Sequence, residues 1–246
     1  NRQLLEMMVE FWSDHFNVYA WGEQWYETFP RHIYNIRKYA LSTFPTLLMQ
    51  MAQSGAMLGY LDNVENRRNA GNENYARELL ELHTMGADEG YTETDVETAR
   101  RCLSGWNVNM DENDEDWGQF KYYKDWHVGS GGSFLGTPIA PSYEMDQGVE
   151  VLTRLAAHPA TARHIATKLC KRFLGDSVSE GAILNVERAY LRRGATSRRC
   201  SAPCSARTLS RSTPGRSTSG PSSTSSAPCE RRTRRSPTPG RSAGAS

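Results

Sequence analysis

No run of about eighteen apolar residues occurs in this 246-residue sequence, so nothing in it predicts a transmembrane helix. Cysteine is scarce: there are five, and no C-x-x-C pair is among them, which excludes a disulfide framework and a zinc site. The motifs H-E-x-x-H and E-x-x-H are also missing, and G-x-S-x-G does not occur within residues 1–195. These absences leave the sequence without a residue set that spells out a known reaction.

The C-terminal part lacks the residues that build a core. Residues 196–246 contain no Lys and a single large apolar residue, Leu209. Ten arginines against one acidic residue, Glu230, give this tail a charge of +9, so with a total of +1 the residues 1–195 carry −8. We therefore expect a disordered tail at 196–246, and a folded body that does not bind nucleic acid.

Two explanations fit the tail. One is a natural Arg/Ser-rich segment that binds nucleic acid or is phosphorylated. The other is out-of-frame translation of a GC-rich gene from about residues 192–200, because the composition changes abruptly after "ILNVERAYLRRG", where a helix is under way. We favour the frameshift. The sequence also begins without Met and already in helical periodicity, so we expect 1–195 to be an incomplete domain with its natural N-terminus missing.

The body itself is rich in helical patterns. Apolar residues recur at the spacing of an amphipathic helix in six segments: 3–17, 31–60 with breaks near Pro45 and Gly55, 72–86, 91–106, 147–157 and 159–174. Between them, "WNVN" and "QFKYY" predict a short hairpin around the acidic tip Asp111–Asp116, followed by the glycine-rich loop "GSGGSFLG". The expected fold class is mainly α, a multi-helix orthogonal bundle with a small β-hairpin and glycine-loop insertion at about 106–137.

Two binding motifs in this insertion are incomplete. The glycine loop has no Lys-Ser/Thr after its last Gly, and Phe134 stands where a dinucleotide fingerprint needs Gly. The acidic run has Asp116 where a calcium loop needs its turn glycine, and Tyr122 where it needs Glu. We interpret the loop as a connection and the run as a solvated hairpin tip.

The stretch "GNENYARELLELHTMG" has clear helix signals. Asn72 is a suitable N-cap and Gly86 can end the helix in a left-handed conformation. Glu73, Arg77 and Glu81 follow at four-residue spacing and predict a ladder of ion pairs.

Histidines provide the candidate chemistry. His15 and His83 each fall on the apolar face of a predicted helix, where an imidazole needs a polar partner. They either donate to a backbone carbonyl or carboxylate, or join Glu78 in a metal or acid–base site, with His127 near the glycine loop as a further acid or base.

A second set of polar residues lies in the segment 159–174. Its spacing predicts that four of them face solvent and could dock an acidic partner: Arg163, His164, Lys168 and Lys171.

Five stretches in sequence order carry a resemblance: "MVEFWSDHFNV", "NENYARELLELHTMG", "YTETDVETARRCLSGW", "WHVGSGGSFLG" and "HPATARHIATKLCKRF". Together they resemble the bacterial family known as domain of unknown function 1800, over residues 1–195, and the matching positions include His15, Glu78, His127 and Lys168. The chain departs from many relatives at Val128, where they have an acidic residue, and at Gly132, where they have Lys.

The resemblance implies a mostly helical, often exported protein with no established reaction, commonly encoded beside a sulfatase-like protein. The first functional hypothesis is therefore a non-catalytic protein, exported to the periplasm or associated with the envelope, that acts with a partner such as this sulfatase-like neighbour. The alternative is a metal-dependent enzyme that uses His15, Glu78 and His83.

Overall fold

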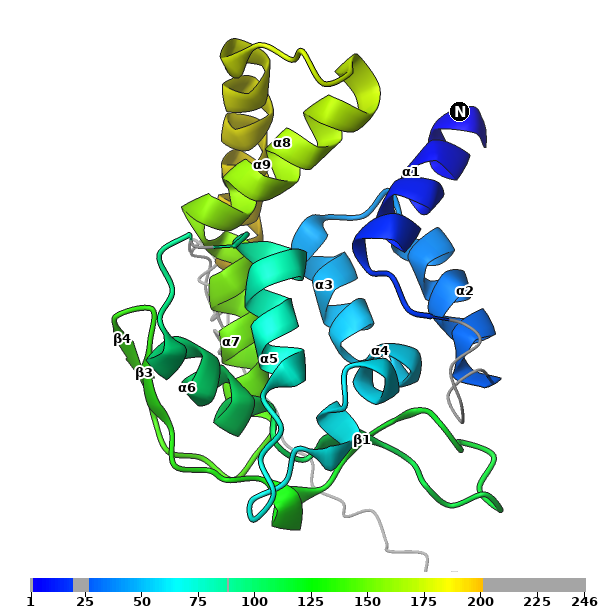
Figure 1. Cartoon of the computed structure of the whole chain (residues 1–246), viewed down its shortest axis with the longest axis vertical. Coiled ribbons are helices and arrows are strands. Elements are labelled where there is room, and N and C mark those ends of the chain that lie inside the picture. Colours follow the sequence, from blue (N-terminus) through cyan, green and yellow to red (C-terminus); the bar gives the residue numbers. More distant parts are fainter. Residues whose placement is uncertain (1, 20–26, 88, 201–246) are drawn as a thin grey trace, which may run out of the picture. The chain divides into compact units, whose positions relative to one another are not determined.

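The computed structural model describes residues 2–19, 27–87 and 89–200, with side chains up to Arg193. The described part is mainly helical, which confirms the predicted fold class (Figure 1). Its α-helices are α1 (Arg2–His15), α2 (Phe29–Tyr39), α3 (Phe44–Ala52), α4 (Gly55–Tyr60), α5 (Asn74–Glu78), α6 (Glu93–Leu103), α7 (Asp146–Ala157), α8 (Pro159–Leu174) and α9 (Glu180–Cys200). Shorter helical turns are η2 (Asn63–Glu65), η3 (Leu79–Thr84) and η4 (Lys124–Trp126). None of the helices in the described ranges combines the length and the apolar content needed to cross a membrane.

The insertion contains two small antiparallel hairpins. Strand β1 (Trp106–Val108) pairs with β2 (Phe120–Tyr122), so the hairpin predicted around the acidic tip is confirmed. The glycine-rich segment, predicted as a loop, forms a second hairpin in which β3 (Gly132–Phe134) pairs with β4 (Thr137–Ile139). Leu135 and Gly136 connect these strands with φ angles of 51° and 71°, the backbone of a two-residue hairpin turn.

A single carboxylate ties the second hairpin to α6. Thr92 caps this helix and forms a capping box with Asp95, as its sequence signals indicate. The other oxygen of Asp95, Oδ1, accepts a hydrogen bond from the backbone N–H of Leu135 at 2.6 Å. The cap of α6 therefore also holds the turn between β3 and β4 in place.

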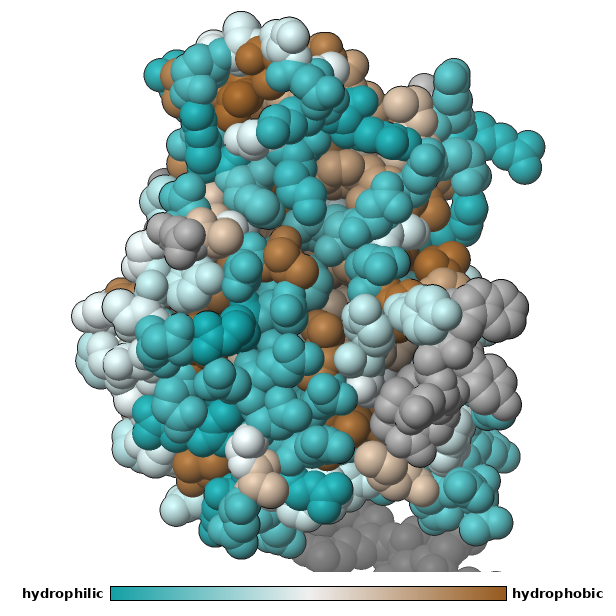
Figure 2. Space-filling model, viewed as in Figure 1, coloured by the Kyte–Doolittle hydropathy of each residue, from teal (hydrophilic) through white to brown (hydrophobic). Residues whose placement is uncertain are grey.

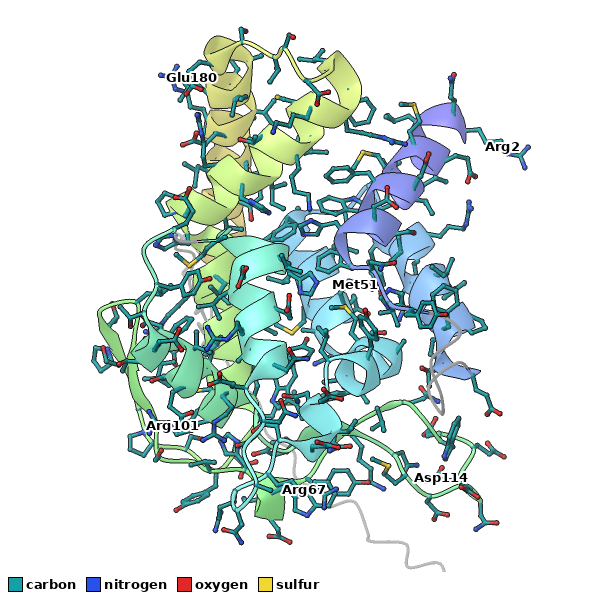
Figure 3. The ribbon with its side chains drawn as sticks, in the orientation of Figure 1. Arg2, Met51, Arg67, Arg101, Asp114 and Glu180 are labelled. Carbon is teal, nitrogen blue, oxygen red and sulfur yellow. The ribbon has the colours of Figure 1, made fainter. Side chains whose placement is uncertain are left out.

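The core lies around α3, which runs between α1 and α2 on one side and α5 and α7 on the other (Figure 1). Met51 on α3 is fully buried near the centre of this core (Figure 3), and Ile36, Leu48 and Leu80 are at most 1% exposed. On the face shown in Figure 2, apolar side chains form separate small areas among hydrophilic ones.

The stretch with the helix signals is only partly α-helical. It begins as α5 at Asn74, and Asn72 accepts a hydrogen bond from the Asn74 N–H at 3.0 Å. From Leu79 to Thr84 it continues as a π-helix, η3, where the sequence predicts a regular α-helix. Gly86 ends it with a φ of 99°, as expected.

The predicted ion-pair ladder on this stretch is also different. Arg77 pairs with Glu73 as expected, but its second partner is Glu93 at the start of α6, and Glu81 forms no ion pair with it. Glu93 of the neighbouring helix α6 therefore takes the place that the sequence predicts for Glu81.

The domain boundary at 195 and the disordered tail remain predictions. The structure shows α9 continuing to Cys200, and the tail from residue 201 onward lies outside the described residues.

Candidate functional site

Three separate parts of the chain bring a group of basic side chains together in the interior. His15 is in the last turn of α1, His83 is on η3, and His164 and Lys168 are one turn apart on α8. The ring centre of His15 lies 6.0 Å from that of His83 and 6.2 Å from that of His164. We call these four residues the basic cluster.

The hydrogen bonds of His15 determine where its proton is. Its Nε2 lies 3.1 Å from the backbone oxygen of His83, and a carbonyl oxygen can only accept, so Nε2 carries the proton. In a neutral imidazole the other nitrogen, Nδ1, then has a free lone pair. Lys168 Nζ lies 2.9 Å from this Nδ1 and donates to it. The lysine amine is therefore bonded to a neutral imidazole.

Burial keeps the imidazoles of the basic cluster uncharged. It lowers the pKa of His15 well below its usual value, and the nearby Lys168 lowers it further. Burial, again helped by Lys168, lowers the pKa of His83 to about 3. The pKa of the half-buried His164 is shifted in the same direction for the same two reasons.

Lys168 is itself half-buried, and burial lowers the pKa of its amine, partly opposed by the carboxylate of Asp14. Within the described part of the chain it makes no ion pair with a carboxylate. An ammonium in this position is poorly solvated. Lys168 therefore loses its proton to become a neutral amine more easily than an ordinary surface lysine does.

Of the predicted site residues, the structure brings His15 and His83 together and leaves Glu78 outside the basic cluster. Burial raises the pKa of the Glu78 carboxyl, as does Glu81, and its Oε2 is buried with no hydrogen-bond partner among the described residues. Both nitrogens of His15 already have partners. In the part of the chain that the structure describes, no three His, Cys, Asp or Glu side chains are placed to hold a metal ion.

His127 lies apart from the basic cluster. It is fully buried, with Nδ1 2.8 Å from the Ser104 carbonyl oxygen and Nε2 2.9 Å from Oε1 of Gln147. Its own carbonyl accepts two hydrogen bonds from Arg68. The two contacts of the ring join the segment after β2 to the end of α6 and to the start of α7. This is the arrangement of a histidine that holds elements of the fold together.

Two members of the basic cluster were not among the site residues predicted from the sequence. The spacing of the segment predicts His164 and Lys168 on a solvent-facing side of α8, but both are half-buried against α1 and η3. Arg163 is also turned toward the protein and pairs with Glu180 and Glu187 of α9, whereas Lys171 is exposed as predicted. Two features of the sequence could have indicated these residues. His164 and Lys168 are four residues apart, which places them on the same side of a helix, and Lys168 is one of the positions that match the family the sequence resembles.

Comparison with known proteins places the chain in a family. A family model described as "Protein of unknown function (DUF1800)" matches residues 1–210. The chain belongs to this family. All four residues of the basic cluster of this DUF1800 chain lie in the matched range, and they come from three of the stretches that carry the resemblance. No curated protein and no solved structure matches this DUF1800 chain.

Proposed function

We propose that this protein is an enzyme in which Lys168 and His15 act as an acid–base pair. The observation that carries the proposal is the hydrogen bond of 2.9 Å from Lys168 Nζ to Nδ1 of His15. It puts an amine and an imidazole, two groups that can exchange a proton, in direct contact, one of them half-buried and the other fixed in one tautomer.

The geometry supports proton movement between the two groups. When Lys168 gives a proton to Nδ1 of His15, it becomes a neutral amine, which can act as a base or a nucleophile. The imidazolium formed in this way keeps its Nε2–H on the carbonyl oxygen of His83, a contact that favours the charged ring. His83 therefore acts as a positioning residue through its backbone. The proposed site shares His15 and His83 with the predicted one, but it uses the backbone carbonyl of His83 and has Lys168 in place of Glu78.

The reactivity of Lys168 can be measured without knowing the substrate. Competitive acetylation with acetic anhydride over a series of pH values, followed by mass spectrometry, reports the titration of each lysine. We expect the acetylation of Lys168 to reach half its maximum below pH 10.5, the pKa of an ordinary lysine side chain. A midpoint at or above that value would contradict an activated amine.

Catalysis is tested by screening the purified protein against chromogenic esters, lactones, amides and phosphoesters. Lys168→Met and Lys168→Arg should both lower turnover by about 10²-fold or more, because neither supplies a neutral amine. Lys171→Met removes an exposed lysine of the same helix and serves as the control. No turnover in the screen, or equal turnover in Lys168→Met and Lys171→Met, would refute the proposal.

A second candidate is the partner-dependent function of an exported or envelope-associated protein. It is favoured by an apolar groove of about 350 Å³ between α1, α3, α8 and α9, lined by Met8, Trp12, Phe44 and Leu169 among others. A groove with helical walls suits the apolar face of a helix from a protein partner. A photo-crosslinking side chain at Leu41, exposed at the rim, should capture one specific protein in cells that express the full-length protein, and capture of none would argue against this function.

A further inference from the structure

A second site is suggested by a polar cavity on the side of α2. The cavity measures about 620 Å³, opens to solvent, and is lined by α2, α3, the start of α4 and residues 118–120, which lead into β2. This volume is in the range of pockets that hold small molecules. The cavity does not include any residue of the basic cluster, so it is independent of the proposed acid–base pair.

Several side-chain amides line this cavity. Asn35 on α2, Gln50 on α3 and Gln53 after it are each half-buried in the cavity wall. Within the described part of the chain, their side chains form no hydrogen bond with protein atoms, although each amide has both donors and an acceptor. Three such groups around one cavity suit a ligand with several hydroxyl groups, since a hydroxyl also donates and accepts.

Two cations add a charge preference. Arg31 and Lys38 line the cavity and are seven residues apart on α2, about 10 Å along the helix axis. Arg31 donates to Gln119 across the cavity, and Lys38 lies over the ring of Tyr39 with no ion pair to a described carboxylate. None of the described lining residues is acidic. A ligand that reaches both cations must be longer than one sugar ring and carry negative charge.

Two aromatic side chains complete the cavity. Tyr34, whose exposed fraction is 61%, and the half-buried Phe120 both contribute to its lining. The apolar C–H face of a sugar ring packs on such rings, while its hydroxyls reach the amides. From the amides, cations and aromatic rings together, we propose that this cavity binds a short anionic oligosaccharide built from uronic acid units.

The proposal is tested by calorimetric titration of the whole protein at low salt with trigalacturonate and, for comparison, the neutral maltotriose. Trigalacturonate should bind at least tenfold more tightly than maltotriose. Lys38→Gln, which removes one charge at the cavity, and Gln50→Leu, which removes one amide at similar volume, should each weaken its binding about tenfold. Lys171→Gln removes a charge from α8, outside the cavity, and should leave binding unchanged.

Several outcomes would overturn the proposal. They are no binding of trigalacturonate, equal binding of maltotriose, and equal affinities of the Lys38→Gln and Lys171→Gln variants. Arg31→Gln provides a second charge variant, and a thermal melt of each variant shows that it is folded. Lys168→Met should bind trigalacturonate like the parent protein, so this test and that of the acid–base pair fail or succeed separately.

Discussion

Ser54 Oγ lies 2.9 Å from Nδ1 of His32, and Nε2 of the same ring lies 3.0 Å from the carbonyl oxygen of Phe16. The carbonyl can only accept, so Nε2 carries the proton and Ser54 donates to Nδ1. One neutral imidazole therefore joins α2 to the start of α4 and to the end of α1. A proton added to Nδ1 would remove the acceptor for Ser54 and place a charge in the interior.

This arrangement predicts acid sensitivity. Burial lowers the pKa of His32 to about 4 and that of His83 to about 3, while an unfolded histidine titrates near 6.5. Below pH 6.5 the unfolded state therefore binds more protons than the folded state, so stability is complete above this pH and falls as the pH decreases. Each histidine should remove about 1.4 kcal/mol per pH unit from the free energy of unfolding once the pH is well below 6.5.

Urea unfolding followed by circular dichroism at pH 7.0, 6.0, 5.5 and 5.0 measures this dependence. His32→Gln should reduce the slope below pH 6 by about 1.4 kcal/mol per pH unit, because one of the titrating groups is gone. A free energy of unfolding that stays constant from pH 7 to pH 5 would show that these histidines are not held neutral.

Gly55→Ala should destabilise the fold. A Cβ atom at Gly55 would lie 2.1 Å from the carbonyl oxygen of Gly118, a contact that only a backbone shift can relieve. We expect a loss of about 1–3 kcal/mol in chemical unfolding. Gly181→Ala at the start of α9, where an added Cβ meets nothing within 4 Å, is the matched control and should have little effect or stabilise slightly. Equal stabilities of the two variants would contradict the close approach.

Asp95→Ala should weaken both α6 and the hairpin of β3 and β4. The change removes the capping box with Thr92 and the hydrogen bond to the Leu135 N–H, for a combined loss of about 2–3 kcal/mol. Hydrogen exchange should also show faster exchange of the Leu135 amide. Glu93→Ala, which removes an exposed carboxylate of the same helix turn, should cost less than about 1 kcal/mol. Unchanged exchange at Leu135 would rule out the connection.

The origin of the tail can be read from the gene. If residues after about 195 are out of frame, one of the two other reading frames should continue with amphipathic helical periodicity, which would add packing partners for the helices of the body. If neither frame does so, the Arg/Ser-rich tail is a genuine part of the protein, and its charge of +9 makes binding to a polyanion the expectation to test.

Local sequence signals predicted most of the helices. The Thr92 cap and the Pro159 start are both found as expected, because each depends on neighbouring residues along the chain. The second hairpin was missed because its turn needs Leu135 in a left-handed conformation, and the tertiary bond from Asp95 helps to hold the residue there. Residue preferences alone argue against that conformation.

The candidate site was predicted only in part for a similar reason. Apolar periodicity placed His15 and His83 inside the fold, and they do lie together. It could not show that α8 turns Lys168 toward them, because the polar residues of α8 follow the same pattern as those of a solvent-exposed helix face. Only the packing of α8 against α1 and η3 distinguishes a half-buried lysine from an exposed one.

The π-helix η3 makes the length of its segment more critical than its composition. A π-turn holds one residue more than an α-turn over the same path, so it behaves as a built-in single-residue insertion. Deleting one residue between Leu79 and Thr84 would remove this insertion and leave a regular α-helix with the residues beyond it in register, whereas deleting two would rotate everything after the deletion by about 100° around the axis. The carbonyl of His83 would then leave Nε2 of His15, and the left-handed Gly86 would no longer lie beside His164. Point substitutions on the outer side, such as at the exposed Leu82, leave this spacing intact, so homologous chains should vary in residue type here while differing in length by no more than the one extra residue of the π-turn.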